Sequence, residues 1–223
     1  MPAPTKEIPE SIAKLWNVLY RETVWLHGRW IMYRQLFGTS QERIDVLNQS
    51  AGTFFQVLNQ TLLHEVQLSL SKLGDPAETR GRKKNLTLRA LQQVIPEFTH
   101  SIDFNEQIVT QLDWYDSACE QIRIRRNTWI AHFDRSTMLD ALITPLEGPS
   151  RSEIEIALSA LREVMNSVEF HFRGSTTAYD LFTMTADGDA LISTLMQGLR
   201  YRQLVDEKVI AHDDLRKNRR SVA

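Results

Sequence analysis

The stretch QLFGTSQERIDVL, residues 35–47, decides the fold, because it turns one long helical pattern directly into another. Gly38 ends the first pattern, and Thr39 with Glu42 has the spacing of a capping box that opens the second. The first apolar stripe comprises Ile12, Leu15, Trp16, Leu19, Leu26, Trp30, Tyr33 and Phe37. The second comprises Ile44, Leu47, Ala51, Phe54, Leu58, Leu62, Val66, Leu70 and Leu73. Two long helices joined by so short a turn are expected to pack antiparallel.

Two further long helices are predicted beyond this pair. Asp103 with Glu106 opens a third helix, whose stripe is Ile108, Leu112, Tyr115, Cys119, Ile122, Arg126, Trp129 and Phe133. Ser152 with Glu155 opens a fourth, whose apolar set is Ile156, Leu158, Leu161, Val164, Met165 and Val168. Shorter helices are expected over residues 86–95 and, more weakly, over 190–205.

These patterns predict an all-α fold, an antiparallel helical bundle with four long helices plus short additional helices. We expect one helical domain over residues 1–223. Residues 1–135 form its core, residues 150–205 complete or extend the bundle, and residues 206–223 are a charged tail. No segment shows sustained strand alternation.

Composition restricts the class of protein. Hydrophobic residues make up 42% and charged residues 24%, as in an ordinary globular chain, and the net charge of −2 gives no global attraction to nucleic acid. The single cysteine, Cys119, permits no internal disulfide and favours a reducing compartment. The start MPAPTKEIPESIAK lacks the apolar run of a signal peptide, and no run has transmembrane length. We therefore expect a cytoplasmic protein with no membrane association.

Common catalytic and metal-binding signatures are missing from the sequence. There is no glycine-rich phosphate loop, no paired-cysteine zinc pattern and no GxSxG motif. His64 and Glu65 lack the second histidine of a zinc-protease helix, so His64 is interpreted as a solvent-facing or capped helix residue. We expect no metal and no cofactor, and we interpret Cys119 as a small buried apolar group.

The stretch RRNTWIAHFDR, residues 125–135, is the exception. Arg126 occupies the stripe that Ile122 and Trp129 define, although arginine is seldom buried unless it is paired. Three explanations remain open: the helix stops packing there, the side chain extends to solvent, or it faces a cleft or a second subunit. His132 lies about 120° further round an ideal helix, so both side chains could reach one small ligand near the helix end.

Together, Arg126, Asn127, Ala131, His132 and Asp134 form R-N-x-x-x-A-H-x-D. This pattern resembles the signature of the HEPN superfamily, an arginine followed by a polar residue and then by a histidine four to six residues later. The preceding segment LSKLGDPAETRGRKKNLTLRAL, within residues 68–91, is similar to that of the abortive-infection U-type branch found in bacterial phage-defence loci.

The resemblance implies a metal-independent endoribonuclease that works as a homodimer, with two arginine–histidine pairs meeting in a composite cleft. Arg126 and His132 would be the catalytic pair, Asn127 would orient them, and Asp134 would support the histidine. Histidine suits proton transfer at the 2′-hydroxyl because its usual pKa, about 6.5, is near working pH. Arginine suits the phosphate because its planar donors stay charged. Whether His132 acts as base or acid stays open.

RNA would be held by local positive charge, which makes its binding dependent on salt. The candidates are Arg80, Arg82, Lys83 and Lys84 in the connection, with Arg123, Arg125 and Arg135 around the motif. The resemblance further allows an antitoxin with a nucleotidyltransferase fold as a partner. The alternative function is a non-catalytic dimer that binds nucleotide or RNA, and a purely structural scaffold is a third class.

Overall fold

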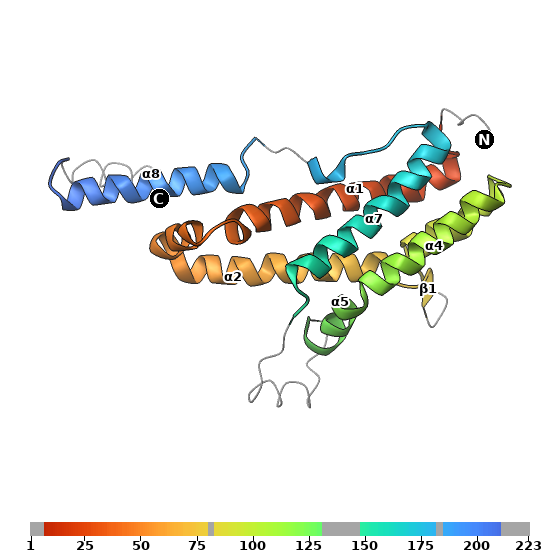
Figure 1. Cartoon of the computed structure of the whole chain (residues 1–223), viewed down its shortest axis with the longest axis horizontal. Helices are drawn as coiled ribbons and strands as arrows, with labels where there is room; N and C mark the ends of the chain where they lie inside the picture. The colour runs from red at the N-terminus through yellow and green to blue at the C-terminus, as the bar shows by residue number, and fades with distance from the viewer. Residues whose placement is uncertain (1–6, 80–82, 131–147, 182–184, 211–223) are drawn as a thin grey trace. The chain divides into compact units, whose positions relative to one another are not determined.

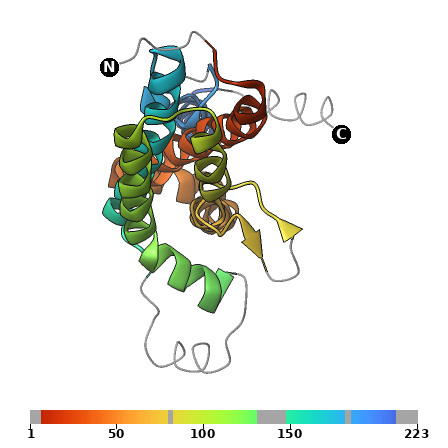
Figure 2. The ribbon, with the colours of Figure 1, turned by 90° about the vertical axis from the view of Figure 1, so that its right-hand side faces the viewer.

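The computed structural model describes residues 7–79, 83–130, 148–181 and 185–210 and confirms the predicted all-α class (Figure 1). The α-helices are α1 (Glu10–Tyr33), α2 (Gln41–Leu73), α3 (Leu88–Val94), α4 (Ile102–Ala118), α5 (Glu120–Arg125), α7 (Arg151–Arg173) and α8 (Gly188–Asp206). Short π- or 3₁₀-helical segments are η1 (Arg34–Gly38), η2 (Ile95–Glu97), η3 (Arg126–Ile130) and η4 (Tyr179–Leu181). Strands β1 (Glu78–Thr79) and β2 (Lys83–Lys84) form a small antiparallel two-stranded sheet beside the end of α2, within the predicted basic connection (Figure 2).

The chain divides into two compact units. The bundle unit comprises residues 1–30 and 62–182, and the hairpin unit comprises residues 31–61 and 183–223. Helices α1 and α2 are each divided between the two units, with one part in the bundle unit and the other part in the hairpin unit.

The bundle unit is built from the first part of α1, the last part of α2, α4 and α7. The pair α4 and α7 is antiparallel, because Gln107 and Gln111 both donate to Ser167 Oγ while Phe104, earlier in α4, stacks on His171, later in α7. The ring centroids of Phe104 and His171 lie 3.8 Å apart. Buried aromatic stacking of this kind fixes the register of two helices as well as burying area.

Polar side chains connect α1 to both of its neighbours. Arg29 donates to Ser69 Oγ on α2, and Trp30 Nε1 donates to Glu155 Oε1 on α7 at 2.6 Å. At the next residue of α2, the Leu70 carbonyl accepts from the Tyr115 hydroxyl of α4. These bonds satisfy polar groups that helix packing removes from water, so they specify which helices meet.

The core of the bundle unit confirms most of the predicted stripes. Its fully or almost fully buried side chains include Ile12, Trp16, Leu19, Leu26, Trp30, Val66, Leu70, Ile108, Leu112, Tyr115, Cys119, Ile122, Leu158, Leu161, Val164, Met165 and Val168. One member is wrong: Ile156 is 45% exposed. Among the residues that the structure describes, no helix combines the length and apolarity needed to cross a bilayer.

The predicted third helix is interrupted, which corrects the expectation of one continuous helix. Backbone angles at Cys119 (φ −91°, ψ 1°) leave the helical region, so α4 ends at Ala118 and α5 begins at Glu120 at an angle to it (Figure 2). The helix also opens differently, because Ser101 Oγ, and not Asp103, caps it by accepting from the Phe104 amide. The break redirects the segment that carries Arg126.

Two other predicted capping boxes are not formed by the predicted residues. Helix α7 begins two residues early, because Ser150 and Glu153 form the reciprocal box that we predicted for Ser152 and Glu155. Thr39 does not cap α2: its hydroxyl donates back to the Arg34 carbonyl. Neighbouring serines and threonines offer the same capping chemistry, so spacing alone does not choose between them.

The hairpin unit contains η1, the first part of α2 and α8. Gln35 connects two of these elements, since its Nε2 donates to Asp187 and its Oε1 accepts from the Gly188 amide. Arg43 of α2 pairs with Asp189 of α8. A Cβ at Gly188 would lie 2.8 Å from the Gln35 Cβ, so glycine is required for this approach.

Helix α2 is kinked within the hairpin unit. Ala51 has φ −159° and ψ 66°, next to Gly52, and the Ser50 hydroxyl donates to the Val46 carbonyl four residues earlier. Serine back-bonding and a neighbouring glycine are established causes of helix bending. The kink shifts the apolar stripe: the predicted core residue Phe54 is 61% exposed, and Phe55 is buried in its place.

Candidate functional site

The RRNTWI segment begins at the end of α5 and continues as the π-helix η3. Arg126 is the first residue of η3, so the helix widens where the stripe changes from Ile122 to arginine. A π-helical turn locally rotates the side chains that follow it, and such turns are frequent at functional sites. The sequence pattern placed Arg126 on the packed face, and the structure explains how a charged residue is tolerated there.

Arg126 is paired within its own protomer. Its Nη1 donates to Asp75 Oδ1 at 2.8 Å, and its Nε donates to Asn127 Oδ1 at 3.0 Å. The two ion-pair partners are 20% and 32% exposed in their side chains, so the guanidinium is held near the surface and is not sealed in the core. Among the described residues, no acceptor is recorded for its Nη2.

Asp75 was missed by the sequence analysis. It lies in the turn after α2, where its amide donates to the Lys72 carbonyl, 51 positions before its partner in the chain. No local spacing signals such a pair. Asp75 lies within residues 68–91, but the predictions made for that segment rest on its family resemblance and on its basic residues, not on the acid.

A second arginine braces the turn that presents Asp75. Arg123 Nη2 donates to Asp116 Oδ1 at 2.6 Å and to the Gly74 carbonyl at 3.3 Å. A Cβ at Gly74 would lie 2.1 Å from Arg123 Nη2 and 2.9 Å from the buried Tyr115 ring, so only glycine allows this approach. Arg123, predicted as an RNA contact, is therefore engaged inside the protomer.

Asp116 collects two arginines in this network. Arg89 of α3 bonds to the same carboxylate that Arg123 contacts. Burial alone would raise the pKa of Asp116, but the hydrogen bonds from Arg123 and Arg89 outweigh burial and hold the pKa below its ordinary value. The acid stays ionised and fixes α3, α4 and α5 around the turn.

A polar pocket of about 230 Å³ lies beside the motif. It is lined by Gln121, Ile124, Arg125, Thr128, Gly148, Pro149 and Glu153. Burial lowers the pKa of Arg125 below its ordinary value, and arginine remains charged at neutral pH despite such a shift. The pocket thus places a half-buried cation one residue before Arg126.

His64 of α2 belongs to the same neighbourhood. Burial lowers its pKa, and the positive charge of Arg125 lowers the pKa further. His64 is half-buried and lies within the electrostatic field of Arg125, so it is not fully solvent-facing. Gln67 and Ser71 follow His64 on one face of α2 and are buried, and Gln67 Oε1 and Ser71 Oγ have no hydrogen-bond partner within the described ranges.

The remaining predicted site residues divide into two groups. Lys83 and Lys84 form β2 and are exposed. His132, Asp134, Arg135, Arg80 and Arg82 lie outside the described residues. The structure therefore brings Arg126 and Asn127 together and describes no geometry for the histidine.

Metal-binding and thiol chemistry find no support in the described parts of the chain. No group of three or more His, Cys, Asp or Glu side chains there could hold a metal ion. Burial raises the pKa of the Cys119 thiol to about 11, so it stays protonated and unreactive at neutral pH. His27 is buried, and burial lowers its pKa to about 4.

Comparison with known protein families identifies the family of the chain. A HEPN family model described as AbiU2 matches residues 10–191. The matched span includes Arg126, its two bonding partners and His132. No curated protein matches the chain, and no solved structure does.

Proposed function

The chain belongs to the AbiU2 family of HEPN proteins, and from this premise we propose that it is a metal-independent endoribonuclease that acts as a phage-defence effector. In this proposal two copies form a homodimer, and each contributes Arg126 and His132 to one composite site. Asn127 orients the arginine, and Asp134 supports the histidine.

The observation that carries the proposal is the state of Arg126. Asp75 and Asn127 fix the guanidinium through Nη1 and Nε, so little side-chain entropy remains to be lost when a ligand binds. The planar donors of a fixed arginine can pair with two phosphate oxygens. Preorganised positive charge of this kind stabilises the negative charge that develops on phosphorus during phosphodiester cleavage.

The reaction needs no metal in principle. The 2′-oxygen attacks the adjacent phosphorus, the bond from phosphorus to the 5′-oxygen breaks, and a proton moves from the 2′-hydroxyl to the leaving oxygen. Histidine can accept or donate that proton near neutral pH. The products are a 2′,3′-cyclic phosphate and a 5′-hydroxyl end.

Substrate would be held by the positive charge around the motif. Arg125 lines the pocket next to Arg126, and Lys83 and Lys84 are exposed on strand β2, which follows Asp75 in the chain. Arg80, Arg82 and Arg135 are proposed to add phosphate contacts. Binding through such groups weakens steeply as salt is raised. A partner with a nucleotidyltransferase fold would act as the antitoxin.

The test is cleavage of total cellular RNA by the purified full chain in the presence of EDTA. We expect cyclic-phosphate ends with the wild type, and at least a hundredfold loss with His132→Ala or Arg126→Ala. His100→Ala is the matched control, because His100 is exposed and remote from the motif in sequence, and it should cleave like the wild type.

Circular dichroism checks that each variant keeps its helices. Undiminished cleavage by a folded His132→Ala protein would contradict the proposal. RNA binding that depends on Arg126, without any cleavage, would support the non-catalytic alternative instead.

A further inference from the structure

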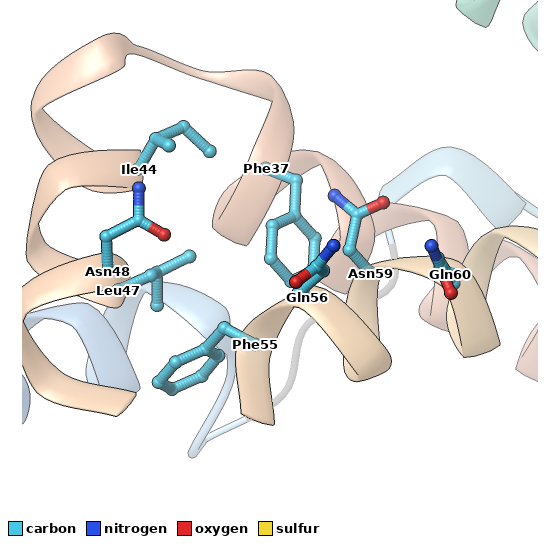
Figure 3. Close-up of a pocket in the computed structure, with 8 residues that line it drawn as sticks. All are labelled: Phe37, Ile44, Leu47, Asn48, Phe55, Gln56, Asn59 and Gln60. Atoms are coloured by element: carbon cyan, nitrogen blue, oxygen red, sulfur yellow. The ribbon is translucent and has the colours of Figure 1, made fainter. Parts of the chain in front are cut away.

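A pocket of about 230 Å³ opens at the kink of α2, wholly within the hairpin unit (Figure 3). Its floor is apolar and consists of the buried side chains of Phe37, Leu47 and Phe55, with Ile44 beside them. Its remaining lining consists of four carboxamides, from Asn48, Gln56, Asn59 and Gln60. Nothing in the proposed ribonuclease site uses these residues.

The kink creates the pocket. Ile44, Leu47 and Asn48 precede Ala51, whereas Phe55 and the other three carboxamides follow it. Figure 3 shows the residues before the kink on one side and Gln56, Asn59 and Gln60 on the other, with the ring of Phe37 between them. The η1 segment therefore supplies one aromatic ring, and the bent helix supplies the rest of the lining.

The charge of the lining restricts the ligand. No acidic or basic side chain lines the pocket, and the nearby Arg43 is engaged by Asp189 and by the Gln35 carbonyl. An ionised phosphate or carboxylate would have no counter-charge here, which makes its desolvation costly. The group bound inside the pocket is therefore neutral.

The carboxamides indicate a ligand with both donors and acceptors. Each carboxamide has one acceptor oxygen and two N–H donors. None of the four makes a side-chain hydrogen bond to another described residue, although Asn59 is half-buried. A purely apolar ligand covering them would leave these groups unpaired, at a cost that disfavours binding.

The floor and the size of the pocket restrict the class of ligand further. Phe37 and Phe55 are buried and contribute ring edges and faces to the apolar floor, which suits contact with a planar ring. The volume is below the range of about 300–1,000 Å³ that accommodates drug-sized ligands, so it suits one ring system and not a whole nucleotide. A carboxamide pairs bidentately with adenine through the 6-amino group and N7.

We propose that this pocket binds a nucleobase, with adenine the best match, over the apolar floor that includes Phe37 and Phe55 and against the carboxamides of Gln56 and Asn59. The base is free of charge, and the sugar and any phosphate stay outside the pocket. The base could belong to a free nucleoside or to a single-stranded RNA. Binding does not require Arg126 or His132.

The experiment is equilibrium dialysis of labelled adenosine against the full chain. We expect saturable binding of one adenosine per chain. Binding should be roughly tenfold weaker for Gln56→Leu or Asn59→Leu, because leucine keeps a similar side-chain size but removes the hydrogen-bonding carboxamide. The matched control is Asn17→Leu, which places the same change on an exposed position of α1 and should bind like the wild type.

Competition distinguishes the two sources of the base. A short oligoadenylate that displaces adenosine at much lower concentration than AMP assigns the site to single-stranded RNA, whereas equal competition assigns it to a free nucleoside or nucleotide; either result supports a base site. Three results overturn the proposal: no saturable binding of adenosine, unchanged binding by the Gln56→Leu/Asn59→Leu double variant, or indole binding as tightly as adenosine.

A protein partner is the remaining occupant, and the same variants test it. If adenosine fails to bind while Gln56→Leu and Asn59→Leu weaken self-association in sedimentation, the face is an interface between copies and the base site is rejected. Because the readout is ligand binding, failure here leaves the cleavage test of Arg126 and His132 unaffected.

Discussion

The two parts of α2 have the same apolar spacing but differ in how far their apolar side chains are buried. In the bundle unit Val66 and Leu70 are completely buried, and Ser69 accepts from Arg29 of α1. In the hairpin unit Phe54 and Val57 are 61% and 59% exposed. A periodic stripe thus predicts that a helix has an apolar face, but the number of elements that cover that face is decided elsewhere in the chain.

The difference assigns separate roles to the two parts. Hydrogen bonds between helices hold the end of α2 in the bundle unit, so the turn after it can present Asp75 to Arg126 at a fixed position. The part in the hairpin unit keeps polar side chains that bond to no other described residue around a kink. The fixed end of α2 positions Asp75 for the proposed cleavage site, and the carboxamides near the kink are available to the proposed nucleobase.

Truncating one side chain in each part gives the largest contrast. Leu70→Ala should lower the free energy of unfolding by about 3 kcal/mol, because it leaves a cavity in a fully buried site. Phe54→Ala should change it by less than about 0.5 kcal/mol, because the ring is mostly in solvent. Urea unfolding followed by circular dichroism measures both. Equal losses would show that Phe54 is covered in solution and would remove the comparison.

Acid should destabilise the bundle unit through His27. Its Nδ1 donates to the Thr23 carbonyl, and burial, followed by the charge of Arg162, lowers its pKa from 6.5 to about 4. The unfolded chain therefore binds the extra proton between these values, and stability falls as pH drops from 6.5 toward 4. At pH 5 the loss is about 2 kcal/mol. His27→Gln should flatten this slope in urea titrations; a slope unchanged by His27→Gln contradicts this assignment.

Asp75 should act on cleavage more than on stability. Asp75→Asn removes the charge that positions Arg126, and we expect kcat for RNA cleavage to fall about tenfold, the effect of one charge-assisted hydrogen bond. The free energy of unfolding should change by less than about 1 kcal/mol, because both partners are partly exposed. Asp75→Glu should restore part of kcat. A change confined to stability would make Asp75 a structural residue only.

The smallest expected effect concerns the kink. Gly52 has space for a Cβ, whose nearest contact would be Asn48 Oδ1 at 3.7 Å. Gly52→Ala should stabilise α2 by about 0.5–1 kcal/mol and, by favouring a straighter helix, weaken adenosine binding. Gly198→Ala in α8, where a Cβ meets nothing within 4 Å, should give the same stabilisation without affecting adenosine binding. Equal adenosine binding by both variants would separate the pocket from the kink.

The prediction of the fold was right where the apolar periodicity was continuous. It was wrong where polar groups rearranged the backbone. The stripes of α4 and α7 located the core, yet the break at Cys119 is marked by no glycine or proline in the sequence. Phe54 was assigned to the core because the kink at Ala51 was not foreseen. Ser50 and Gly52 carried that signal, but such pairs also occur in straight helices.

The candidate site was only partly predictable for the same reason. Arg126 was found because a charged residue interrupted a stripe and matched a short family signature. Asp75 and His64 could not be found, because their relation to Arg126 and Arg125 depends on how α2 and α5 pack, not on spacing along the chain. Arg123 was assigned to RNA for lack of any sign that Asp116 and Gly74 would engage it.

The central claim is that two copies of Arg126 and His132 form one ribonuclease site, and a mixed dimer tests it most directly. One protomer is wild type, the other carries Arg126→Ala with His132→Ala, and two different affinity tags isolate the heterodimer. Cleavage of total cellular RNA is then measured in EDTA against the wild-type homodimer. A composite site predicts that activity falls far below half, on the order of a hundredfold or more, because one half of the charge stabilisation is missing. Retention of half the wild-type activity would contradict the claim, since each protomer would then cleave RNA with its own residues alone.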